Sequence, residues 1–157
     1  MTEYMKEMRR LVGKRPIFQC GASLIIFKSN NQVLMMRRTD NNCWCFPGGS
    51  LELGEKAEET AVREAKEETG LYIDAKDLKL FNVFSGKDLY YKYPNGDEVY
   101  NIDIVYITDR FYGNMETSDE SREIRFFDMD KLPLEISPPV VPVVNMLKER
   151  FYNSSNE

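Results

Sequence analysis

The 157-residue sequence contains no histidine. Without an imidazole, the chain cannot build a Ser-His-Asp or Cys-His nucleophile system, a His-ligated zinc site or a histidine general base from its own residues. Cysteine is scarce as well, because Cys20, Cys43 and Cys45 are an odd number with no C-x-x-C pair. A disulfide framework and a four-cysteine zinc site are therefore excluded. Any catalysis must rely on carboxylates, lysines, tyrosines or a bound cation.

The sequence also lacks a long apolar run and an excess of positive charge. No stretch approaches the roughly 18 apolar residues of a membrane-spanning helix, and charges are scattered through residues 1–16 where a signal peptide would be apolar. The 26 acidic residues outnumber the 21 basic ones, which argues against broad binding to nucleic acid. We therefore expect one cytoplasmic domain over residues 1–157, without membrane contact and with a small-molecule ligand.

Hydrophobic periodicity and turn residues predict the order of elements along the chain. A short helix is expected within a basic N-terminal extension, residues 1–15, and a hairpin is expected around Ser29-Asn30-Asn31. The expected strands are residues 18–27, 32–38, 78–84, 89–93, 98–108 and 123–127, and the expected helices are residues 4–12, 55–69 and 138–152. This order predicts an α/β fold in which helices pack on a mixed sheet.

Three glutamates fall on one face of the second expected helix. At 100° per residue, Glu64, Glu67 and Glu68 lie at relative angles of about 0°, 300° and 40°. Like charges at this spacing repel, so such a face favours a bound cation. A Glu-rich helix by itself is more often a solvated surface. Here, however, the helix follows the glycines of the Pro47-Gly48-Gly49 loop, which allow backbone groups to approach an ion or a phosphate closely.

Mg²⁺ is the cation that this pattern favours, because it takes oxygen ligands from a few carboxylates and fills its remaining positions with water and substrate phosphate. It also neutralises phosphate oxygens and lowers the pKa of bound water, so no histidine is required. The pattern therefore predicts metal-dependent chemistry on a phosphorylated substrate.

Residues 49–71 resemble the signature of the Nudix hydrolases, G-x5-E-x7-R-E-U-x-E-E-x-G-U, where U is a bulky aliphatic residue. The matching residues are Gly49, Glu55, Arg63, Glu64, Glu67, Glu68, Gly70 and Leu71, and only Ala65 is smaller than the pattern prefers. The preceding residues 44–49 are similar to the family as well. The order of strands and helices extends the resemblance to nearly the whole chain.

The resemblance implies an α/β/α sandwich, with a mixed β-sheet between helices. It also implies cation-dependent hydrolysis of a diphosphate bond in a nucleoside diphosphate linked to another moiety X, such as a nucleoside triphosphate or a nucleotide sugar. By position, Glu64, Glu67 and Glu68 would hold Mg²⁺ or Mn²⁺, and the carbonyl of Gly48 would be a further ligand. A homodimer is common among relatives, and the N-terminal helix is the candidate contact.

Roles for the remaining site residues follow from the same resemblance. Arg63 and Glu55 would orient the carboxylates through charge-assisted hydrogen bonds. Glu64 is the first candidate for the general base, and Glu120 or Glu123 are the alternatives because relatives often supply a carboxylate from this later loop.

Three further residues are candidates for contact with the substrate. Trp44 precedes the glycine loop, where it either covers a base or packs in the core. Tyr91 is on a strand face that either lines a pocket or packs in the sheet. Arg38 ends a strand beside the loop.

The sequence narrows the substrate mainly by exclusion. This sequence has no clean counterpart of the proline that marks ADP-ribose pyrophosphatases or of the tyrosine that marks diadenosine polyphosphate hydrolases, so neither specificity is supported. Isopentenyl diphosphate isomerases need histidine ligands, which excludes that branch. RNA decapping is disfavoured by the excess of acidic residues. A non-catalytic nucleotide-binding regulatory module is the alternative function. Such relatives usually lose a catalytic glutamate, whereas all the glutamates of the signature are present here.

Overall fold

The structure is a computed structural model and describes residues 2–29 and 31–154. Its helices are α1 (Glu3–Val12), α2 (Ala57–Thr69) and α3 (Val141–Ser154), with 3-10 turns η1 (Ala75–Asp77), η2 (Lys87–Leu89), η3 (Met129–Lys131) and η4 (Pro138–Val140). Its strands are β1 (Ile17–Ser29), β2 (Gln32–Arg38), β3 (Trp44–Cys45), β4 (Gly48–Ser50), β5 (Lys79–Phe84), β6 (Tyr90–Lys92), β7 (Glu98–Thr108) and β8 (Ser121–Asp128).

The sheet is built around a parallel pairing of β1 with β7, which runs from Ile17 opposite Val99 to Ile26 opposite Thr108. All other pairings of these strands are antiparallel: β1 with β2 and β4, β2 with β3 and β8, and β7 with β5 and β6. The sheet is therefore mixed, as the order of elements predicted. Because β4 is short and pairs only with β1, it holds the glycine loop directly against the central strand.

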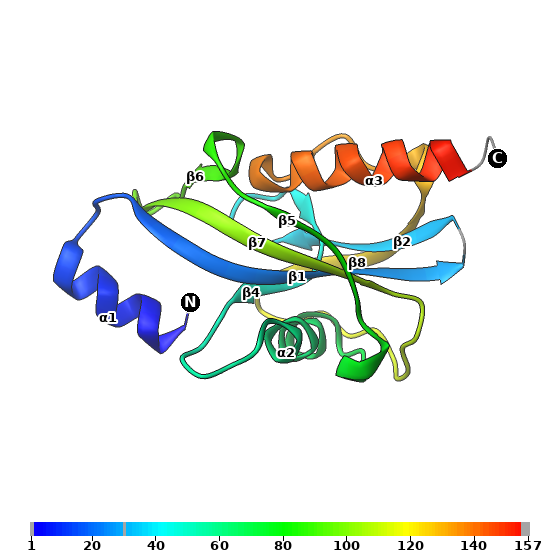
Figure 1. Cartoon of the computed structure of the whole chain (residues 1–157), viewed down its shortest axis with the longest axis horizontal. Helices are drawn as coiled ribbons and strands as arrows, with labels where there is room; N and C mark the ends of the chain where they lie inside the picture. The colour runs from blue at the N-terminus through cyan, green and yellow to red at the C-terminus, as the bar shows by residue number, and fades with distance from the viewer. Residues whose placement is uncertain (1, 30, 155–157) are drawn as a thin grey trace.

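Helices cover both faces of this sheet (Figure 1). Residues alternate along β1, so that Ile25 packs in the core beneath α3, while Leu24 and Ile26 pack in the core beneath α2. Ala65 of α2 is fully buried in the second of these cores. Its small side chain brings α2 close to the sheet, and the α/β arrangement with a sheet between helices is confirmed.

Local signals predicted most boundaries to within a few residues. The second helix begins at Ala57 rather than at residue 55, because Glu55 lies in the preceding loop and Lys56 is the N-cap. The expected helix over residues 138–152 begins as the 3-10 turn η4 and continues as α3, with Pro142 in its first turn. The β1–β2 hairpin is confirmed, although residue 30 in its turn lies outside the described residues.

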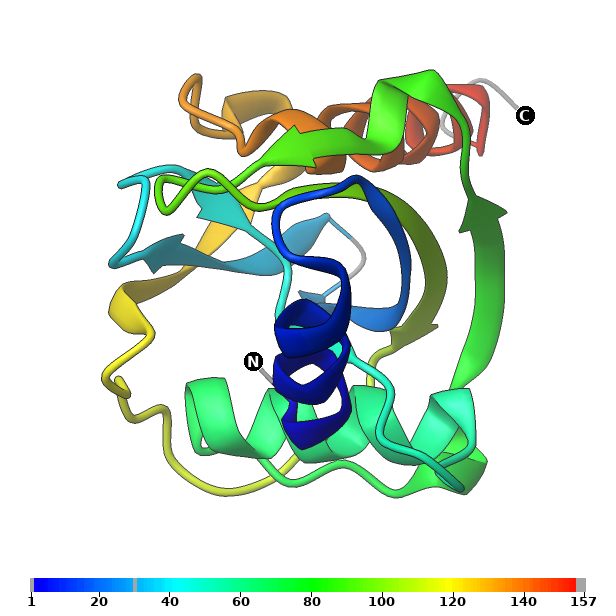
Figure 2. The same ribbon diagram turned by 90° about the vertical axis from the view of Figure 1, so that its left-hand side faces the viewer.

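The N-terminal extension forms α1, which stands across one end of the curved sheet (Figure 2). Thr2 caps the helix by accepting a hydrogen bond from the Met5 amide at 3.2 Å, and Met5 is buried. Arg9 donates to the Glu98 carbonyl at 2.7 Å and lies 3.7 Å from the Asp97 carboxylate. These contacts tie the extension to the start of β7. Among the described residues, no helix has the length and apolarity needed to cross a membrane.

Candidate active site

The three glutamates of the signature's helix face, Glu64, Glu67 and Glu68 of α2, are buried to different degrees. Glu68 is buried at 4% exposure, the Glu64 side chain is 13% exposed, and the Glu67 side chain is 59% exposed. All three line one cavity, as the helical angles predicted. The carboxylates on this face of α2 therefore range from buried, at Glu68, to exposed, at Glu67.

Glu68 is held against the glycine loop by a backbone hydrogen bond. The Gly48 amide donates to Glu68 Oε2 at 2.8 Å. Burial, together with the nearby Glu64 and Glu120 carboxylates, raises the pKa of Glu68 to about 8, whereas the Gly48 amide acts in the opposite direction. Burial also raises the pKa of Glu64. Burial is the main cause of both shifts, and the neighbouring carboxylates add to it, so a bound cation would favour the charged form of both groups.

Arg63 ties the loop before the helix to the glutamates of the helix. Its Nε and Nη2 donate to the two oxygens of Glu55 at 2.7 and 3.0 Å, and its Nη1 donates to Glu64 at 2.7 Å and to Glu67 at 3.4 Å. Nη2 also donates to the Ser50 carbonyl at 3.3 Å. The Arg63 hydrogen bond lowers the pKa of Glu55 to about 2. This arrangement matches the orienting role that the resemblance implies for Arg63 and Glu55.

The two glycines of β4 lie close to different parts of the protein, so replacing each with alanine should affect different properties. A Cβ on Gly49 would lie 2.5 Å from the Glu64 carboxylate, which is the end of a flexible side chain. We expect Gly49→Ala to displace Glu64 and lower kcat by roughly 10- to 100-fold, with a small change in melting temperature. Activity assays and thermal unfolding measure the two effects.

Gly48→Ala is the contrasting variant. Its Cβ would lie 2.6 Å from the Ala22 carbonyl oxygen and 2.7 Å from Ser23 Cα, which belong to the backbone of β1. We expect this variant to lose stability, by about 1–3 kcal/mol. Equal loss of stability in both variants would contradict the distinction.

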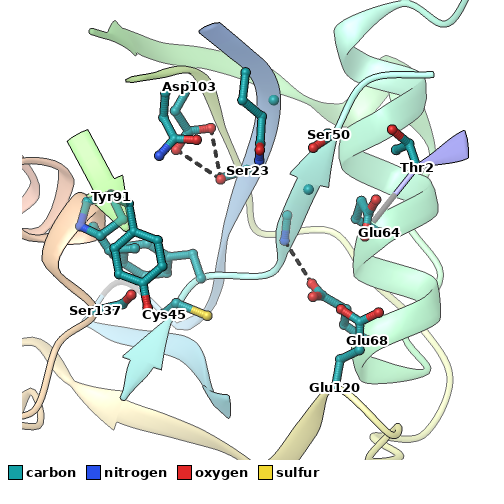
Figure 3. A pocket seen from close by; sticks show the side chains of 18 of the residues that line it. Thr2, Ser23, Cys45, Ser50, Glu64, Glu68, Tyr91, Asp103, Glu120 and Ser137 are labelled. Atoms are coloured by element: carbon teal, nitrogen blue, oxygen red, sulfur yellow. Dashed lines mark hydrogen bonds between the residues drawn. The ribbon is translucent and has the colours of Figure 1, made fainter. Parts of the chain in front are cut away.

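The cavity beside these residues has a volume of about 560 Å³ and is lined by α2, β1, β4, β6, β7 and the loop before α3 (Figure 3). This volume lies in the usual range for small-molecule sites. Glu120 lines the cavity, and its charge acts on both Glu64 and Glu68. Glu123 lies in β8 outside the cavity lining and pairs with Arg125. Of the two later glutamates, the structure brings only Glu120 to the site.

The three candidate substrate contacts have different positions. Trp44 is buried in the core, with its ring edge-on to Phe127 at 4.8 Å, and does not line the cavity. Tyr91 lines the cavity, and its hydroxyl accepts from Asn41 at 2.9 Å. Arg38 also lines it and donates twice to Asp40, at 2.8 and 2.6 Å. The structure thus keeps Tyr91 and Arg38 at the site and places Trp44 behind it.

Sequence reasoning missed a group of polar residues on β1 and β7. Gln19, Ser23, Asn101 and Asp103 line the cavity. Along β7, the inward positions change from Asn101 and Asp103 to Val105, which is fully buried. A polar pair at inward positions of an otherwise apolar strand was the available signal.

The donor set of the α2 face fits a hard divalent cation. It consists of carboxylate oxygens beside a glycine whose missing Cβ leaves room for Glu64. Within residues 2–29 and 31–154, no three acidic or cysteine side chains are arranged closely enough to ligate one ion together. Mg²⁺ is usually held by one or two carboxylates and several waters, so this spacing is compatible with it.

The fold and the site together define a mixed-sheet α/β protein with an acidic helix beside a nucleotide-sized cavity. Residues 18–145 match the NUDIX domain family, so the chain belongs to that family and the resemblance of residues 49–71 is confirmed. The chain is similar to the crystal structure of a MutT NUDIX hydrolase from Burkholderia pseudomallei, with a TM-score of 0.68 and 23% identity, covering 83% of this chain and 97% of the other. That likeness supports the fold.

Two relatives extend the sequence comparison. An ADP-ribose pyrophosphatase from Methanocaldococcus jannaschii is 39% identical over 111 residues, or 69% of this chain and 61% of the relative. The uncharacterized Nudix hydrolase YvcI from Bacillus subtilis is 26% identical over 109 residues, or 68% of this chain and 65% of the relative. The chain thus matches slightly less than two thirds of the length of either relative.

Proposed function

We propose that this protein is a metal-dependent pyrophosphohydrolase that cleaves a diphosphate bond in a nucleoside diphosphate linked to another moiety X. The observation that carries the proposal is that Gly49 and all the charged residues of the signature line the cavity, with Arg63 bonded to both Glu55 and Glu64. The regulatory alternative is less well supported, because non-catalytic relatives usually lose a catalytic glutamate and all the glutamates of the signature are present here. The M. jannaschii relative, named as an ADP-ribose pyrophosphatase, supports the same reaction class.

The proposed roles of the residues follow from their positions. Glu64, Glu67 and Glu68 hold Mg²⁺ or Mn²⁺, and the carbonyl of Gly48 is a further ligand. The ion supplies charge neutralisation at the phosphate oxygens and a lowered pKa of bound water. Glu68 fixes the position of the glycine loop through the Gly48 amide. The shape of the site thus depends on the same side chains that hold the charge.

Two carboxylates are candidates for the general base that removes the proton of the attacking water. Glu64 remains the first candidate, because it is one of the glutamates of the helix face and is oriented by Arg63 at 2.7 Å. Glu120 is the alternative, because it lines the cavity from the opposite loop. Glu123, outside the cavity lining and paired with Arg125, is not part of the proposed site.

We also propose that residues 1–157 act as one domain in the cytoplasm. The buried Met5 and the Arg9 contacts support a common unit for the N-terminal extension and the matched region. The odd number of cysteines, without a C-x-x-C pair, supports a reducing compartment. A homodimer through α1 stays a prediction, and sedimentation tests it.

The proposed function is tested by incubating the protein with Mg²⁺ and a panel of GTP, ATP, ADP-ribose and a nucleotide sugar. We expect at least one member to yield a nucleoside monophosphate with release of pyrophosphate or of the phosphorylated X group. Chromatography of the products identifies the bond that is cleaved. Binding of these nucleotides without any turnover would favour the regulatory module instead.

A further inference from the structure

Asp103 is a partly buried carboxylate that lines the cavity on the side away from α2 (Figure 3). It lies on β7, and the Ser23 hydroxyl of β1 donates to its two oxygens at 2.9 and 3.0 Å. One hydroxyl has one proton to share between the two oxygens. An ionised carboxylate accepts about four hydrogen bonds, so most of its capacity faces the cavity without a donor among the described residues.

Among the described residues, no basic side chain acts on the charge of Asp103. Burial raises the pKa of Asp103 to about 6, the Ser23 hydrogen bond lowers it, and no charged neighbour contributes. A pKa of about 6 still lies below neutral pH, so the ionised form that accepts hydrogen bonds is accessible there. A partly buried carboxylate without an ion-pair partner is costly to keep, and one role that justifies the cost is recognition of ligand donors.

The cavity that Asp103 lines also has aromatic side chains in its wall. Tyr91 and Tyr93 lie on the same face of β6 and its extension, with ring centroids 4.9 Å apart, and both line the cavity. Leu89 and Phe46 add apolar lining. Aromatic side chains beside a polar group are the usual surroundings of a nucleobase, because bases stack on aromatic rings.

We propose that Asp103 is the base-specificity residue of this site and accepts two adjacent N–H donors of a guanine-type base. This inference rests on the proposed function for the identity of the ligand as a nucleotide. Guanine offers its ring N–H and its amino group side by side, which matches the two oxygens of one carboxylate. Adenine offers an amino donor beside a ring nitrogen acceptor, which faces a carboxylate oxygen with a lone pair.

The experiment compares wild-type protein with Asp103→Asn on GTP, inosine triphosphate and ATP in Mg²⁺. In the wild type, we expect kcat/KM to fall roughly 10- to 100-fold from GTP to inosine triphosphate, which lacks the amino group, and further for ATP. An asparagine offers one acceptor and one donor, so Asp103→Asn should reverse the preference toward ATP. Asp109→Asn, an exposed residue just beyond β7, is the matched control and should keep the wild-type ranking.

If Asp103→Asn lowers kcat/KM equally for all three nucleotides, the role of Asp103 is structural and the proposal is overturned. Removal of the 2′-hydroxyl is the second arm, because a carboxylate also binds a ribose diol. If kcat/KM for dGTP is as far below that for GTP as the value for inosine triphosphate is, Asp103 contacts the sugar and the base assignment is wrong.

Calorimetric binding of GDP, IDP and ADP separates this inference from the proposed function. A preference for GDP that Asp103→Asn reverses supports the base assignment even in a protein without turnover. Turnover without any base preference would retain the hydrolase and reject the assignment. Failure to bind any of the three nucleotides rejects the assignment as well.

Discussion

Glu68→Gln should lower kcat roughly a thousandfold, which corresponds to about 4 kcal/mol of transition-state stabilisation. Glutamine has nearly the same volume and keeps an oxygen to accept the Gly48 amide at 2.8 Å, so the glycine loop should stay in place. What the variant loses is the buried negative charge that we propose to hold the metal. Steady-state kinetics with the preferred nucleotide measures the effect.

Stability distinguishes this loss from unfolding. Burial and the nearby Glu64 and Glu120 carboxylates raise the pKa of Glu68 to about 8, so glutamine replaces a carboxyl whose charged form is already disfavoured in the metal-free protein. We expect the metal-free variant to melt no lower than the metal-free wild type. Glu59→Gln is the matched control, because Glu59 is exposed on the same helix and accepts a hydrogen bond from the Lys56 amide. Near wild-type turnover in Glu68→Gln would exclude Glu68 from the proposed metal site.

Chelation of divalent cations by EDTA should abolish turnover, and excess Mg²⁺ or Mn²⁺ should restore it. The expected loss is complete because His-based catalysis is unavailable to this chain and the acidic face cannot neutralise phosphate charge by itself. Product formation is measured before chelation, after it and after readdition. Undiminished turnover in excess EDTA would reject the metal-dependent mechanism.

Metal binding should also appear as a thermal shift. At a concentration of 100 times the dissociation constant, Mg²⁺ would stabilise the folded state by about 2.7 kcal/mol, which raises the melting temperature by roughly 5–10 °C in a domain of this size. Glu59→Gln should show the full shift, and Glu68→Gln little or none. This readout is independent of the substrate.

The parts of the fold that the sequence predicted were those specified by local signals. Gly70 ends α2 in a left-handed conformation with φ of 76°, as a glycine after a helical pattern indicates. Asn95-Gly96 joins β6 to β7 as a hairpin turn. The parallel pairing of β1 with β7 had no local signal, because it joins residues about 80 positions apart.

The site divides in the same way. The glutamates of α2 and Arg63 were found because a helix fixes their spacing, and the signature named them. Glu120 and Glu123 are three residues apart, and only the start of β8 at Ser121 decides that the first faces the cavity. From the sequence alone, a tryptophan beside a glycine loop fits a core position as well as a pocket position. The packing of Trp44 against Phe127 in the folded structure distinguishes the two.

The β1–β7 pairing has a consequence for how the protein folds during synthesis. β1 leaves the ribosome early, but its parallel partner and the polar cavity wall at Asp103 are made only after the whole acidic helix has emerged. Such long-range contacts slow folding, because loop closure costs entropy before the contacts form. The interior residues of β1, such as Ile25 and Ile26, are exposed to aggregation for that interval. The β1–β2 hairpin, whose partners are adjacent in sequence, is the element best placed to shelter them until β7 arrives.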